Sequence, residues 1–85
     1  MDRVPDKRVV HRARVVAALD SALAAHVRAE RRHYEAAEAH DRVADFWAIG
    51  GDAGKAAHER DLARREREHA AIEHERYLSA QRQAP

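Results

Sequence analysis

The chain has 85 residues, and its 16 basic and 15 acidic side chains leave a net charge of only +1. This length corresponds to one small domain over residues 1–85, and the lack of cysteine in the sequence excludes disulfides and cysteine-based metal or redox chemistry. Hydrophobic residues make up 45% of the chain, but most of them are alanine, so a fold of this size would bury little apolar area.

A first, long helix is predicted from about residue 6 to residue 49. Asp6 follows Pro5 and is a favourable N-cap, because its carboxylate can accept a hydrogen bond from an unpaired amide of the first turn. A helix of this length would span about 65 Å at about 1.5 Å per residue, which is typical of coiled-coil-like elements. An apolar stripe recurs along it at the helical period, through Val9, Val16, Leu19, Leu23, Val27, Tyr34, Ala37, Ala44 and Ala48.

The only strong break in the helical sequence is a turn predicted over residues 50–54, which holds every glycine of the chain. Gly50 and Gly51 supply the left-handed position that ends a helix, and Asp52 can cap a second helix over residues 53–83. A short connection makes consecutive helices antiparallel neighbours. The predicted fold class is therefore all-α: an antiparallel two-helix hairpin that completes a four-helix bundle by dimerisation.

A partner is expected because a lone hairpin with few large apolar side chains would struggle to offset the entropy of ordering it. That partner is a second copy, which gives a homo-oligomer, or another protein. Threonine and asparagine are absent, and no nucleophile with an organised base is visible, which favours a non-enzymatic role. The predicted interface is an Ala/Leu/Val seam whose larger residues are Val16, Leu19, Leu23, Val27, Tyr34, Trp47, Leu62 and Tyr77.

Carboxylates and imidazoles interrupt the apolar stripes and give the alternative function, a metal site. Counted back from the turn, Glu30 lies level with Glu73, and carboxylates and imidazoles could converge at that height. Buried carboxylates are costly unless they are paired or bind a metal. The competing interpretation is a narrow alanine-rich seam whose polar neighbours extend to water. If the seam interpretation holds, no cofactor is expected. If the metal interpretation holds, iron or another divalent metal would be held by Glu30, His33, Glu66, His69 and Glu73.

Three imidazoles of the first helix recur at intervals of seven, at His26, His33 and His40. Successive members of this series are about 10 Å apart along a helix, so they cannot share one metal ion without ligands from another helix. They are interpreted as half-buried residues flanking the seam, or as a pH-sensitive interface, since imidazoles in general titrate near neutral pH.

The second helix contains a Glu-x-x-His sequence at residues 66–69, a spacing that places a carboxylate and an imidazole on one helix face. Together with Glu-His-Ala-Ala at residues 68–71, it resembles the short ferritin-like proteins found inside encapsulins. That resemblance implies a two-helix hairpin that dimerises to complete an iron site, with this glutamate and histidine among the ligands. Ala36 stands where that family has its first-helix glutamate, so Glu35 or Glu38 would have to substitute.

A tryptophan precedes the turn in the segment Trp47-Ala48-Ile49-Gly50. Two helices joined by a glycine turn with a nearby tryptophan resemble the small helical-hairpin substrates of type VII secretion systems, which carry Trp-x-Gly there. The resemblance implies a dimeric four-helix bundle exported without a cleaved signal peptide. This turn is one residue longer than that motif, and the segment Tyr77–Gln81 ends in glutamine where the family often has an acid.

The start of the first helix is basic, with Lys7, Arg8, Arg12 and Arg14, and it would extend past the second helix. A solvated face, an acidic partner or nucleic acid would each fit these charges, but the net charge of +1 argues against DNA binding as the main role. The sequence has neither a run of about 18 apolar residues nor an apolar signal segment. We therefore expect no membrane contact and a cytoplasmic protein, or one exported without a cleaved signal.

Overall fold

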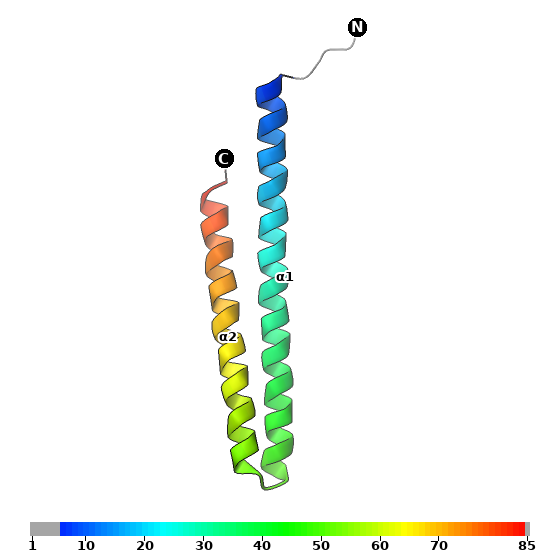
Figure 1. The fold of residues 1–85 in the computed structure, drawn as a ribbon, viewed down its shortest axis with the longest axis vertical. Coiled ribbons are helices and arrows are strands. Elements are labelled where there is room, and N and C mark those ends of the chain that lie inside the picture. Colours follow the sequence, from blue (N-terminus) through cyan, green and yellow to red (C-terminus); the bar gives the residue numbers. More distant parts are fainter. Residues whose placement is uncertain (1–5, 85) are drawn as a thin grey trace.

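The computed structural model describes residues 6–84 and shows, within them, two α-helices and no strand: α1 (Lys7–Ile49) and α2 (Ala53–Arg82). The all-helical prediction is confirmed. α1 has 43 residues and α2 has 30. α2 returns alongside α1, so the start of α1 and the end of α2 lie towards the same end of a rod (Figure 1). The rod measures 77 × 23 × 10 Å, which makes it a single layer, two helices wide.

Each helix begins at an aspartate that caps its free amides. Asp6 Oδ1 accepts a hydrogen bond from the Arg8 amide at 2.8 Å, and Asp52 Oδ1 accepts one from the Lys55 amide at 2.9 Å. These bonds satisfy amide groups that have no partner inside the helix. Both predicted N-caps are therefore found, and the helices end within one residue of their expected limits.

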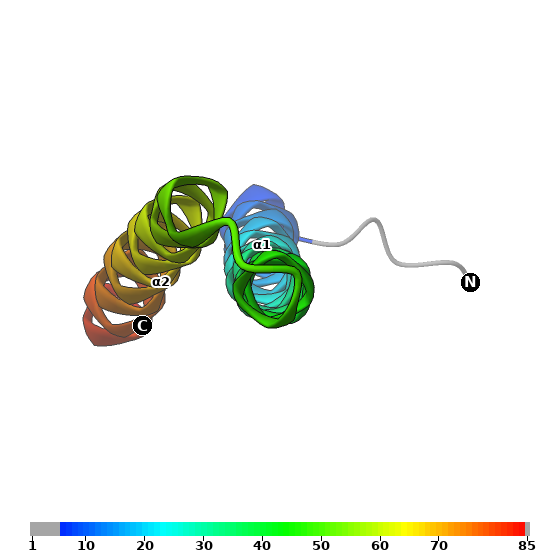
Figure 2. The same ribbon diagram turned by 90° about the horizontal axis from the view of Figure 1, so that it is seen from below.

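The connection between the helices consists of residues 50–52, because α2 begins at Ala53, as predicted, and includes Gly54. Only Gly51 adopts the left-handed conformation, with φ of 83°, whereas Gly50 has φ of −75°. The Asp52 amide donates to the Trp47 carbonyl at 2.9 Å and so closes the end of α1. Figure 2, seen from the turn, shows the two helices inclined to each other.

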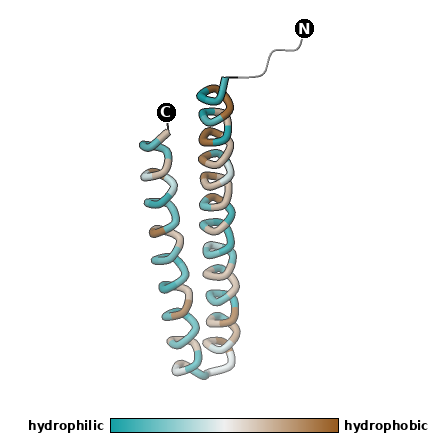
Figure 3. The backbone as a smooth tube through the Cα atoms, turned by 45° about the horizontal axis from the view of Figure 1, so that its top comes forward, coloured by the Kyte–Doolittle hydropathy of each residue, from teal (hydrophilic) through white to brown (hydrophobic). Residues whose placement is uncertain are grey.

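The first part of α1 extends past the end of α2 (Figure 1). We call this part, residues 7–16, the overhang. Apolar residues are concentrated in this part of α1 (Figure 3). Val9 is 63% exposed, and Val15 and Val16 are also exposed. Among the residues the structure describes, neither helix is long and apolar enough to cross a membrane.

Candidate functional site

Alanines alone form the fully buried contact between the two helices. Along each helix they are spaced by seven residues, so they return to the same face after two turns. Alanine methyl groups let two helices approach closely, but each contributes little buried apolar area. No larger side chain is fully buried in residues 6–84. We call this contact the alanine seam, and its members are Ala37, Ala44, Ala56, Ala63 and Ala70.

A row of imidazole–carboxylate contacts runs along one side of the alanine seam, and we call it the histidine–glutamate ladder. Three histidines of α1 each bond through Nδ1 to Oε2 of a glutamate on α2, and successive steps are again seven residues apart on both helices. An ionised carboxylate only accepts hydrogen bonds, so each imidazole is the donor. The steps are His26–Glu73 at 2.8 Å, His33–Glu66 at 2.6 Å and His40–Glu59 at 2.7 Å.

The ladder is half-buried rather than enclosed. The exposed fractions of the side chains in its middle step are 31% for His33 and 27% for Glu66. Pairs in such a setting are partly screened by water, so each contributes modestly to stability. Because all three bonds join α1 to α2, they position the helices relative to each other.

Glu73 is the one carboxylate of the ladder that accepts two side-chain hydrogen bonds. Besides His26, it accepts a hydrogen bond from Nη1 of Arg76 at 2.8 Å. The His26 bond is the main cause that holds the pKa of Glu73 below its ordinary value of 4.5, with help from Arg76 and against the opposing effect of partial burial. Glu73 therefore stays ionised in acid solution where a free glutamate begins to protonate.

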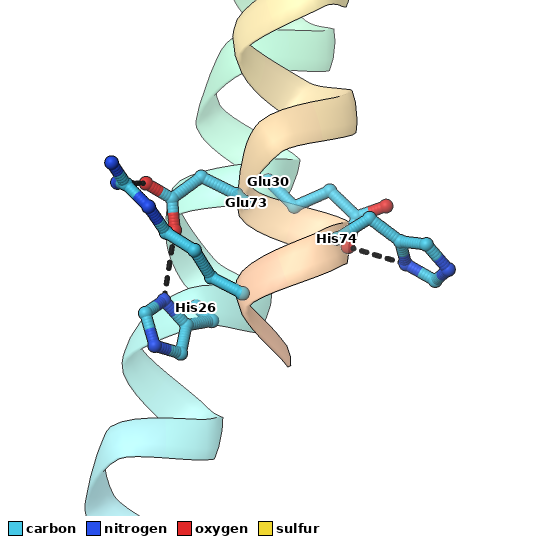
Figure 4. Close-up of polar contacts among 5 residues, drawn as sticks. His26, Glu30, Glu73 and His74 are labelled. Atoms are coloured by element: carbon cyan, nitrogen blue, oxygen red, sulfur yellow. Dashed lines mark hydrogen bonds and ion pairs between the residues drawn. The ribbon is translucent and has the colours of Figure 1, made fainter. Parts of the chain in front are cut away.

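A second set of charged contacts lies on the other side of the alanine seam. Arg67 contacts Asp41, Arg60 contacts Asp45 at 3.3 Å, and the remaining pair joins Nδ1 of His74 to Oε2 of Glu30 at 3.5 Å. Figure 4 shows the His26–Glu73 and Glu30–His74 contacts directed to opposite sides. The seam is thus flanked by polar pairs on both sides.

Of the five predicted metal ligands, the structure brings three together. His33, Glu66 and His69 each offer a ligand atom, and these atoms all lie within 4.8 Å of one another. Glu30 and Glu73 occupy the same height, but their carboxylates point apart and bond to other partners (Figure 4). The expected convergence of all five residues is therefore not found within one chain.

The ladder partners His26, His40 and Glu59 were missing from the predicted site. Their signal is present in the sequence, because Glu59, Glu66 and Glu73 repeat at the same interval of seven as the three histidines. Matching the two series predicts the ladder. Counting residues from the turn does not predict the ladder, because a contact also requires that both residues face the partner helix.

The predicted interface residues divide into two groups. The exposed group shares one side of α1 and comprises Val16, Val27 and Tyr34, which are 40%, 42% and 45% exposed. Val27 and Tyr34 also line a surface groove with Glu30, Arg31, Glu35 and Glu38. The half-buried group lies nearer to the junction of the helices and comprises Leu19, Leu23, Trp47, Leu62 and Tyr77.

No protein-family model, curated protein or solved structure matches this chain. Its function is therefore argued from its own geometry.

Proposed function

We propose that this chain is a non-enzymatic helical hairpin that acts by self-association, with two copies packing as a four-helix bundle. The observation that carries the proposal is the distribution of apolar side chains. All five fully buried residues are alanines, whereas larger apolar residues such as Val16, Val27 and Tyr34 stay exposed. A second copy laid on this side of α1 would bury the area that one chain leaves in water.

Charge favours an antiparallel arrangement of the two α1 helices. The overhang is basic, whereas residues 33–49 of α1 carry four acidic side chains against a single basic one, Arg42. In an antiparallel pair, the basic end of each copy faces this acidic end of the other. Val27 lies near the middle of α1, where the two-fold axis of such a pair would pass.

The mass of the purified chain in solution tests this proposal. Sedimentation equilibrium at micromolar concentration should give about twice the chain mass of 9.6 kDa. The double substitution of Val16 and Val27 by glutamate places charges in the proposed interface and should shift the mass towards that of one chain. A folded wild-type monomer would overturn self-association.

Ala39→Glu provides the matched control. Ala39 is exposed on α1 and does not belong to the proposed interface, so a glutamate introduced there should leave the dimer mass unchanged. Circular dichroism of every variant should show the helical signal retained. If Ala39→Glu dissociated the protein as strongly as the double variant, the change would reflect net charge and the assigned face would be wrong.

A further inference from the structure

The middle step of the histidine–glutamate ladder differs chemically from the two outer steps. One helical turn after each glutamate, at the third following position, α2 presents another side chain towards the same side. After Glu59 this residue is Leu62 and after Glu73 it is Arg76, but after Glu66 it is His69. Only the middle step therefore combines two imidazoles with one carboxylate.

These three side chains already lie close together. The rings of His33 and His69 meet edge to face, with centroids 5.2 Å apart, and Glu66 Oε2 lies 2.6 Å from Nδ1 of His33. His69 makes none of the hydrogen bonds or ion pairs found within residues 6–84, and its side chain is exposed. It is therefore able to turn towards an ion without giving up a hydrogen bond or an ion pair.

Two imidazoles and one carboxylate are a known ligand set for Zn²⁺, in which a water molecule takes the fourth position. Zinc bonds of about 2.0–2.1 Å place tetrahedral ligand atoms about 3.4 Å apart. The ligand atoms here lie within 4.8 Å of one another, so modest rotations of side chains would close the site without moving either helix.

The surroundings leave room for the fourth ligand. A surface hollow beside the two imidazoles is lined by His33, His69, Ile72, Glu73 and Arg76. Arg76 is the one arginine or lysine among these lining residues, and its charge is offset by the hydrogen bond that it donates to Glu73. A hydrated Zn²⁺ would therefore meet one ionised ligand and little uncompensated positive charge.

We propose that His33, Glu66 and His69 form a mononuclear Zn²⁺ site contained in a single chain, with water as the fourth ligand. The site does not require the proposed dimer, because α1 and α2 of one chain supply all three ligands. It also differs from a dimer-completed iron site, because it uses neither Glu30 nor Glu73.

Zinc titration of the full chain, monitored by isothermal titration calorimetry, tests the site. The wild type should bind one Zn²⁺ per chain, and the thermal unfolding midpoint should rise with zinc concentration, since the ion binds the folded state. His69→Ala removes one ligand at an exposed helical position where alanine is well tolerated. The loss of that ligand should weaken zinc binding by at least about tenfold, since even changes behind the ligands have effects of that size.

His40→Ala is the control that separates metal binding from the ladder. It removes one ladder step, as His33→Ala does, but it leaves all three proposed ligands in place. His33→Ala should therefore lose both zinc binding and zinc-dependent stabilisation, while His40→Ala should keep both. Absence of zinc binding in the wild type would overturn the site. Equal affinity in wild type and His69→Ala would also overturn it, because the ion would then be held by other histidines.

Discussion

The alanine seam makes a strong prediction about overpacking at Ala70, which is fully buried between the helices. The neighbouring Ala71 is exposed on the same turn of α2 and gives a matched comparison. Leucine and alanine have similar helix propensities, so Ala70→Leu and Ala71→Leu should differ only in packing. Three additional carbon atoms must fit between the helices in the first variant, whereas they extend into water in the second.

Forcing extra methylene groups into a filled contact typically costs about 1–3 kcal/mol. Exposed substitutions usually change stability by less than about 0.5 kcal/mol. For a domain of this size, about 1 kcal/mol corresponds to a shift of about 4–8 °C in the unfolding midpoint. Ala70→Leu should therefore unfold at least about 4 °C below Ala71→Leu.

Thermal unfolding followed by circular dichroism measures this difference. Both variants should be compared at equal protein concentration and with a chelator present, because association and bound metal would each shift the midpoint. If the two variants unfold within about 0.5 kcal/mol of each other, the helices do not approach closely at Ala70, and the role assigned to the alanine seam is wrong.

Three other changes test the turn, the cap and the ladder. Gly51→Ala should destabilise the protein by about 1–2 kcal/mol in chemical denaturation, because φ at Gly51 is positive, whereas Gly54→Ala should be neutral or stabilising by up to about 1 kcal/mol. Asp52→Ala should lower the free energy of unfolding by about 1 kcal/mol, because the Lys55 amide loses its acceptor. Glu73→Gln should be less stable than the wild type at neutral pH. The pKa of Glu73 is lowered in the folded state, so its contribution is present above about pH 4.5 and is lost as the pH falls through the folded pKa. The wild type and Glu73→Gln should thus converge in unfolding scans at low pH. Glu75→Gln changes an exposed glutamate of the same helix and should stay close in stability to the wild type at neutral pH.

The helices and their caps could be predicted from the sequence because their signals are local. Aspartate before each helix and glycine at the connection define the ends with little ambiguity. The contacts across the helices were harder to predict. Counting from the turn placed Glu30 level with Glu73, yet the two residues face opposite sides (Figure 4). Height along a helix and direction around it are separate quantities, and the first alone does not identify a contact.

Direction around the helix is contained in the repeat of seven, which both helices share. On α1 this repeat consists of His26, His33 and His40. Its counterpart on α2 begins at Glu59, which lies outside the predicted site. The close approach of His33 and His69 depends on rotamers and on the inclination of the helices, which composition and spacing do not determine. His69 was predicted as a ligand from its spacing to Glu66, and its proximity to His33 became evident only in three dimensions.

The repeat of seven also determines how firmly the pairing of α1 and α2 is specified. If α2 slid along α1 by seven residues, alanine would again face alanine, and two ladder steps could form with new partners. The side chains alone therefore discriminate weakly between registers one heptad apart. Such a slide moves α2 by about 10 Å along the axis. The three residues between the helices span only about 10 Å when fully extended, and they must also cross the roughly 8–10 Å between the helix axes, so the connection forbids the slide. A smaller slide is compatible with a slightly distorted connection, but it would break all three ladder bonds at once. The connection therefore excludes registers of α2 that are shifted by a whole heptad, and the ladder bonds exclude smaller shifts.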